Sequence, residues 1–156
     1  MKHSVINNEI FVTLPDRFTI MDRSQLEKYF RSSKNRWGIM SDEHRIMIYV
    51  GWTGENVLLD LFADTQRVLR SAVSRARRHM SGYTMIKTLR SNICGSKADG
   101  VRFEYTAPDS PDRQLGEIVA VKLGRRYYIM ACTGRSEESF LCRQIFHGLI
   151  TSMHIK

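Results

Sequence analysis

The sequence predicts an α+β fold in which helices sandwich an antiparallel β-sheet. Two observations predict it. In the second half of the chain, four segments with strand-like patterns follow one another with short connections, as in a meander. The segments with helical periodicity lie before and after this run and do not alternate with its strands. Strands that are segregated from helices in this way are typical of an α+β sandwich.

The first third of the chain predicts a strand, a short helix and a second strand. Apolar and other side chains alternate over residues 9–15 (EIFVTLP), and Pro15 ends that strand. Asp22 is placed to cap a helix over 24–30, with Gln25 completing a capping box. The β-branched and aromatic segment 44–52 (HRIMIYVGW) predicts the second strand.

A longer helix is predicted over residues 64–81. Asp64 is placed to cap its start, and Gly82 can adopt the left-handed conformation that stops a helix. Its apolar residues recur at helical spacing: Leu69, Ala72, Val73, Ala76 and Met80.

The meander and a last helix complete the fold. The four strands are predicted at 83–90, 100–107, 116–123 and 125–132. A turn-rich loop spans 107–114, and Gly124 supplies a tight turn. The final helix is predicted from Ser136 to Thr151. Its apolar side is expected to consist of Leu141, Ile145, Phe146, Leu149 and Met153.

Composition indicates one globular domain spanning residues 1–156, because no repeat, low-complexity tract or linker divides the chain. Three cysteines without a C-x-x-C pair argue against a disulfide framework. No apolar run is long enough to span a membrane, so we expect a cytoplasmic protein. The net charge of +8, from 24 basic and 16 acidic residues, favours acidic partners such as nucleic acid, an anionic membrane surface or an acidic protein.

Residues 123–138 (LGRRYYIMACTGRSEE) contain the most reactive-looking residues of the chain. A thiol phosphatase loop needs an arginine six positions after its cysteine, but Glu138 occupies that position after Cys132. Period-two spacing places Cys132 on the strand face of Tyr128 and Met130, which predicts a core thiol.

The polar residues that follow have structural interpretations. Residues 133–135 are expected to form a turn, and Ser136 to cap the last helix. Arg125 and Arg126 are expected at a hairpin tip, in water. The alternative is an enzyme whose dispersed site is built from His44, Cys132 and Arg135.

The sequence contains no complete motif for binding a cofactor or a metal ion. Residues 95–102 contain G-x-x-x-x-G, but the Lys and Ser/Thr that would reach phosphates and magnesium do not follow. The five histidines show no metal-binding spacing. We therefore expect no cofactor and no metal.

The helix at 64–81 carries the candidate partner-binding residues. They are Arg67, Arg70, Arg75, Arg77 and Arg78. No acid follows them at helical spacing within the helix. This face could contact nucleic-acid phosphates or dock an acidic protein, or it could be solvated or paired with acids of neighbouring elements. Tyr83 is the only aromatic residue close by that could stack on a base.

The chain resembles the Mog/PsbP-like fold, which is shared by the Ran-binding Mog proteins, the PsbP subunit of photosystem II and many bacterial proteins. The resemblance rests on FVTLPDRF (11–18), ICGSKADGVRFEYTAPD (93–109), GEIVAVKLGRRYYIMACTG (116–134) and ESFLCRQIFHGLITSMHI (138–155). These stretches are similar to that family's opening strand and Leu-Pro turn, its central strand and hairpin, and its closing helix with a strand stub. The resemblance implies a bacterial cytosolic binding scaffold without known catalysis. It does not supply the partner, because the basic helix differs from the acidic surface through which Mog proteins meet Ran.

The sequence therefore predicts a noncatalytic binding or adaptor domain. Its partner would be a protein, acidic in character, or a second copy bound through an edge strand or the basic helix. Nucleic-acid binding through residues 64–81 is the alternative, and an enzyme is the third hypothesis.

Overall fold

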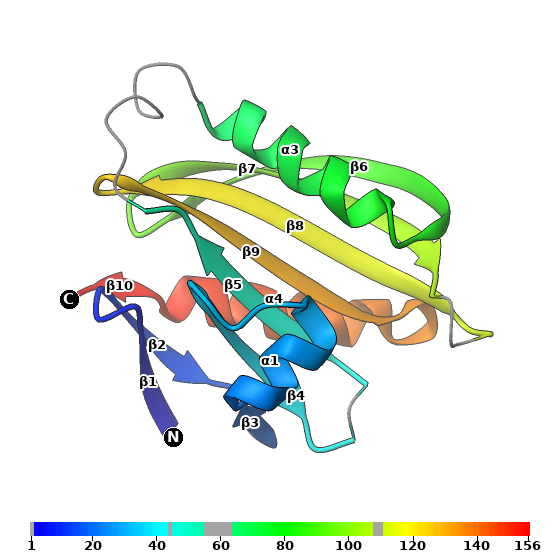
Figure 1. The fold of residues 1–156 in the computed structure, drawn as a ribbon, viewed down its shortest axis with the longest axis horizontal. Coiled ribbons are helices and arrows are strands. Elements are labelled where there is room, and N and C mark those ends of the chain that lie inside the picture. The colour runs from blue at the N-terminus through cyan, green and yellow to red at the C-terminus, as the bar shows by residue number, and fades with distance from the viewer. Residues whose placement is uncertain (1, 44, 55–63, 108–110) are drawn as a thin grey trace.

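The structure, a computed structural model, describes residues 2–43, 45–54, 64–107 and 111–156 (Figure 1). Its helices are α1 (Arg23–Phe30), α3 (Thr65–Arg77) and α4 (Ser139–Ser152), and the 3-10 helix η1 (Ser136–Glu138) precedes α4. Its strands are β1 (Lys2–Ile6), β2 (Ile10–Leu14), β3 (Phe18–Ile20), β4 (Arg36–Ser41), β5 (Met47–Trp52), β6 (Ser81–Ile93), β7 (Ser96–Thr106), β8 (Arg113–Leu123), β9 (Arg126–Arg135) and β10 (His154–Ile155).

A seven-stranded sheet in the order β3-β4-β5-β9-β8-β7-β6 forms the centre of the fold, and every neighbouring pair is antiparallel. The predicted meander is confirmed as β6 to β9, each strand pairing with the next. The predicted strands at 9–15 and 44–52 are confirmed as β2 and β5. Three strands, β1, β3 and β4, were not predicted from the sequence, because they are short or lack clear alternation.

Helices cover both faces of the sheet, as predicted. On one face, α3 packs through Leu69 against Ile118 and Ala120 of β8, and α1 packs through Leu26 against Met40 of β4. On the other face lie α4 and a smaller sheet in the order β1-β2-β10. Figure 1 shows α3 across one side of the long strands and α4 across the other.

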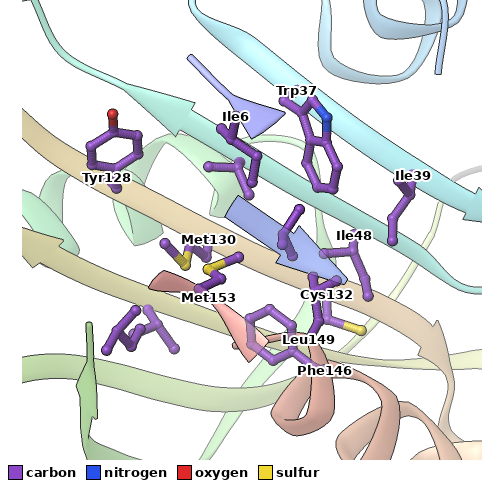
Figure 2. Close-up of a cluster of buried hydrophobic side chains, with 14 of the residues drawn as sticks. Ile6, Trp37, Ile39, Ile48, Tyr128, Met130, Cys132, Phe146, Leu149 and Met153 are labelled. Carbon is purple, nitrogen blue, oxygen red and sulfur yellow. The ribbon is translucent and has the colours of Figure 1, made fainter. Parts of the chain in front are cut away.

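The largest core lies between the main sheet, α4 and the small sheet (Figure 2). Tyr128, Met130 and Cys132 of β9 point into it together, which confirms the predicted strand face. The residues labelled in the close-up come from both sheets, from α4 and from the residue that follows α4: Ile6, Trp37, Ile39, Ile48, Tyr128, Met130, Cys132, Phe146, Leu149 and Met153. Interior apolar burial of this kind is the main stabilising contribution to such a fold.

A polar cluster ties the small sheet to the main one. The Tyr128 hydroxyl donates a hydrogen bond to the carboxylate of Glu9, and Asn7 Nδ2 donates to the Tyr128 hydroxyl at 3.1 Å. Arg126 forms an ion pair with the same carboxylate. The expectation that Arg126 is merely solvated at the hairpin tip is therefore wrong, whereas Arg125 is exposed.

The start of α1 is as predicted. Asp22 accepts a hydrogen bond from the Gln25 backbone N–H at 2.8 Å, and the Gln25 side chain accepts one from the Asp22 N–H at 3.0 Å. This is a complete capping box, which satisfies two donors that the helix itself leaves free.

The predicted turn at residues 133–135 is wrong, because these residues continue β9. Gly134 pairs with Leu115 of β8, and Arg135 pairs with Gln114. A side chain at position 134 would collide with the Cys142 sulfur. Glycine is therefore present for the close approach of α4 and not for a turn.

The last helix begins later than predicted. Ser136 starts η1 without capping it, its hydroxyl has no hydrogen-bond partner among the described residues, and α4 begins at Ser139. In α4, Cys142 faces the core and Leu141 is 47% exposed. The expected core position of Leu141 is wrong. The expected positions of Phe146, Leu149 and Met153 are correct, and Ile145 packs at the core margin.

Candidate partner-binding surface on helix α3

Helix α3 is fixed at its start by a side-chain cap and along its length by apolar contacts. The carboxylate of Asp64 accepts a hydrogen bond from the Arg67 backbone N–H at 2.8 Å, as predicted. Leu69 and Ala72 are buried against the sheet. The helix thus presents its remaining face to solvent.

The helix ends earlier than predicted. Its last residue is Arg77, and Gly82 lies within β6 and not at the helix end. Gly82 does adopt the expected left-handed conformation, with φ of 60°. It lies between Ser81, which pairs with Thr106 of β7, and Thr84, where the register of the ladder shifts.

A shallow depression of about 510 Å³ lies between α3 and the neighbouring strand β7. Leu69 and Val73 of the helix and Val101 of β7 provide apolar atoms to it. Ser74 and three arginines complete the lining: Arg70, Arg77 and Arg78. We refer to these seven residues as the arginine groove.

The structure brings three of the five candidate arginines together and separates the other two. Arg70, Arg77 and Arg78 line the groove, whereas Arg67 and Arg75 do not. Arg75 lies near Tyr49 of β5, whose pKa is raised by burial and partly lowered again by the charges of Arg36 and Arg75. The candidate site is therefore smaller than the basic helix as a whole.

Arg77 is held in place by an aromatic side chain. Its guanidinium lies 4.4 Å from the centre of the Tyr83 ring, which in turn packs 5.1 Å from Phe103. Burial raises the pKa of Tyr83, and the charge of Arg77 opposes this. Tyr83 is thus covered by Arg77 on one side and used in packing, so it is not a free platform for a nucleic-acid base.

The groove arginines are not neutralised by neighbouring acids within the part of the chain that the structure describes. There, no ion pair joins Arg70, Arg77 or Arg78 to a carboxylate. Arginines elsewhere have such partners: Arg45 with Glu138, Arg102 with Glu117, Arg113 with Glu104, Arg126 with Glu9, and Arg135 with Glu137. The alternative that acids of adjacent elements balance the groove is not supported among the described residues.

Cys132 and Arg135, the two described residues of the enzyme hypothesis, have structural surroundings. Cys132 is 4% exposed, its Sγ lies 4.0 Å from the Cys142 carbonyl oxygen, and burial raises its pKa well above the usual value. Such a thiol is a poor nucleophile, because the thiolate is the reactive form. Arg135 instead pairs with Asp112 and Glu137 at the surface. The third residue of the enzyme hypothesis, His44, lies outside the described residues.

Two functionally suggestive residues were missed from the sequence. Val101 contributes to the groove, and no local pattern could assign it, because its place depends on how α3 crosses the sheet. Glu117 is buried and paired with Arg102 at 2.8 Å. A single acid within the apolar segment 115–121 is a signal that could have indicated this pair.

The described residues provide neither a group of metal ligands nor a membrane-spanning helix. No group of His, Cys, Asp and Glu side chains there is arranged to hold a metal ion. None of the described helices is long and apolar enough to cross a membrane.

Comparison with solved structures identifies the fold. LpqN, a protein involved in cell envelope biogenesis of Mycobacterium tuberculosis, superposes with a TM-score of 0.67 at 14% identity, covering 94% of this chain and 83% of LpqN. Cyanobacterial PsbP (CyanoP) from Synechocystis sp. PCC 6803 gives 0.65 at 11% identity, covering 98% and 90% of the two chains. The Ran-binding protein Mog1p of Saccharomyces cerevisiae gives 0.64 at 9% identity, covering 99% and 94%.

The chain therefore has the Mog/PsbP-like fold, as the sequence resemblance implied. No protein-family model and no curated protein matches the sequence. At these identities the likeness concerns the fold alone, and the site must be interpreted from its own chemistry.

Proposed function

We propose that this protein is a noncatalytic binding domain that docks an acidic segment of a protein partner in the arginine groove. The observation that carries the proposal is an arginine cluster, beside an apolar floor, that forms no ion pair with a carboxylate of the described residues. An arginine fork binds carboxylates through paired hydrogen bonds, and the apolar floor can accept one hydrophobic side chain.

The fold comparison supports a binding role without supplying the partner. Mog1p, which shares the fold, is a Ran-binding protein. The three cysteines of this chain are all free, which suits the cytoplasm as the place of action.

Nucleic-acid binding through the same helix is the less favoured alternative. Only three arginines converge, and Tyr83 is occupied by Arg77 and Phe103. An extended phosphate backbone would be expected to use a longer basic track with free aromatic rings. An acidic peptide with an apolar residue matches the groove better.

The proposal is tested by selecting short random peptides against the protein and measuring one enriched synthetic peptide by fluorescence anisotropy. We expect the enriched peptides to combine Asp or Glu with an apolar residue. Removing two groove charges with Arg70→Ala/Arg78→Ala should weaken binding by about 1–2 kcal/mol, or about 5- to 30-fold, at about 0.5–1 kcal/mol per exposed ion pair.

Two controls separate charge in the groove from charge in general. Lys34→Ala/Arg125→Ala removes two exposed charges outside the groove and should leave binding unchanged. Val101→Thr keeps the strand-favouring shape but makes the floor of the groove polar. It should therefore lower the affinity for the peptide about 5-fold, while contacts between the arginines and nucleic-acid phosphates would be unaffected.

The same variants distinguish peptide binding from nucleic-acid binding at the groove. Tight binding of single-stranded or duplex nucleic acid that falls steeply with salt, responds to Arg70→Ala/Arg78→Ala and ignores Val101→Thr would replace the proposal with its alternative. Selection of peptides without acidic residues would also contradict it.

A further inference from the structure

Strand β6 (Ser81–Ile93) is the last strand of the main sheet, and β7 is its one neighbour among the described residues. In an edge strand, alternate residues direct their backbone N–H and C=O groups away from the sheet. Thirteen residues make β6 long for an edge strand. It therefore offers a row of hydrogen-bonding groups along an edge that no strand of the described residues covers.

Helix α3 leaves most of β6 uncovered, apart from Tyr83, which contacts Arg77. The helix packs on β7, β8 and β9, and the side chains of β6 are almost all exposed. Met85 and Ile86 are 51% and 48% exposed. Val101 at the floor of the arginine groove pairs with Thr88 of β6, so the open edge runs beside the groove.

The charge of this edge is basic. Lys87 and Arg90 are exposed on β6, and no ion pair joins them to a carboxylate of the described chain. Arg90 pairs in register with Asp99, whose carboxylate accepts a hydrogen bond from Thr65 at the start of α3. Because directly paired residues share a face of the sheet, Arg90 lies on the face that carries α3.

We propose that β6 takes up an extended acidic segment of the partner as an additional strand, with acidic side chains on the α3 face directed toward Arg90 and the groove arginines. This inference rests on the proposed function and specifies how the partner is held. Backbone hydrogen bonds would provide affinity, and the basic side chains would select the acidic sequence.

A second copy of this chain fits the edge poorly. Pairing β6 with itself would bring Lys87 and Arg90 of both copies together, next to two arginine-rich helices, in a protein of charge +8. The β6 ladder also has register shifts between Ser81 and Thr84 and between Met85 and Lys87. Charges and bulges at a sheet edge oppose self-pairing, but the charges attract an acidic strand.

The test uses a peptide of alternating glutamate and valine and two derivatives, one N-methylated at every glutamate and the other at every valine. In an extended strand, the N–H groups of alternate residues point to opposite sides. We expect one derivative to lose at least about tenfold in affinity and the other to stay within about threefold. Which of the two derivatives loses affinity shows whether the added strand is parallel or antiparallel to β6.

Two measurements on the protein accompany the peptide series. Hydrogen exchange of backbone amides should slow in β6 when the parent peptide binds. Lys87→Glu/Arg90→Glu should weaken binding at least about tenfold, whereas Lys34→Glu/Arg125→Glu should not.

The outcomes separate this inference from the proposed function. Equal binding of all three peptides, with Arg70→Ala/Arg78→Ala still weakening it, would overturn strand addition and leave groove docking intact. If the parent peptide does not bind at all, strand addition at β6 is also overturned, whereas groove docking is still judged by the selected peptides. A dimer in sedimentation that disappears in Lys87→Glu/Arg90→Glu would show that the edge serves a second copy instead.

Discussion

At the scale of single residues, the structure buries an ion pair between Glu117 and Arg102, in surroundings where an unpaired charge would be strongly destabilising. Glu117 is 2% exposed and lies in the same row of the sheet as Arg102 on β7 and Cys132 on β9. Its Oε1 lies 2.8 Å from Arg102 Nε. Removing one member of a buried pair leaves the other charge without compensation, which costs more than the pair itself contributes.

Glu117→Ala should therefore lower the free energy of unfolding by about 3–5 kcal/mol. Glu104→Ala is the matched control, because Glu104 pairs with Arg113 at 3.7 Å in a half-exposed position and should contribute at most about 1 kcal/mol. Urea unfolding followed by circular dichroism measures both. Replacing the pair by Arg102→Met/Glu117→Leu should restore much of the loss, and failure to do so would show that the strand needs the acid for another reason.

At the scale of elements, α1 and α3 begin in the same way. Asp22 and Asp64 each accept a hydrogen bond from the backbone N–H three residues later. Only α3 carries the arginine groove. The two helices thus form a natural pair in which loss of a cap can be separated from loss of a binding surface.

Asp64→Ala and Asp22→Ala should each destabilise the protein by about 1 kcal/mol, because each removes one N-cap. If α3 is the docking helix, Asp64→Ala should also weaken binding of the peptide selected on the groove, because the start of the helix frays. Asp22→Ala should leave this binding unchanged. Thermal unfolding and anisotropy measure the two effects. Equal loss of binding in both variants would indicate that global stability, not α3, controls affinity.

The local patterns explain which elements could be predicted. Asp22 with Gln25, and Asp64 ahead of an apolar stripe, are signals contained in a few neighbouring residues, and both helix starts are confirmed. Ser136 gave the same signal and was wrong. There the β8–β9 ladder extends through Arg135, and long-range pairing overrides a local cap.

At the scale of the whole molecule, the small sheet is joined to the main sheet by the cluster of Asn7, Glu9, Arg126 and Tyr128. Burial and the hydrogen bond to Glu9 raise the pKa of Tyr128 to about 12. An unfolded tyrosine titrates near 10. The folded state therefore holds this proton more tightly than the unfolded state does.

The sign of the pH dependence follows. Below pH about 10, Tyr128 keeps its proton in both the folded and the unfolded state, and the cluster contributes fully to stability. As the pH rises from about 10 toward 12, Tyr128 loses the proton only in the unfolded state, so the free energy of unfolding falls. Urea unfolding at increasing alkaline pH should show this decline, and Tyr128→Phe should flatten it. Glu9→Gln should lower the Tyr128 pKa in an absorbance titration. An unchanged titration in Glu9→Gln would mean that the contact with Glu9 does not hold the proton.

The net charge also acts at this scale. A charge of +8 steers acidic molecules toward the whole surface, so composition alone predicted the sign of the partner and not the place where it binds. The arginine groove depends on α3 crossing β7, which brings Val101 beside Arg70 across a large separation in sequence. Arg75, three residues before Arg78 at the end of the same helix, lies instead near Tyr49.

The sequence by itself determined the fold class, the starts of α1 and α3, the meander and the inward face of β9, because periodicity and caps are properties of neighbouring residues. Only the tertiary structure decided which arginines converge, that Glu117 and Arg102 meet, that Gly134 serves close packing, and that β6 pairs with β7 alone among the described residues. Each of these depends on elements distant in the chain, whose relative placement is set by packing of the core and not by local pattern.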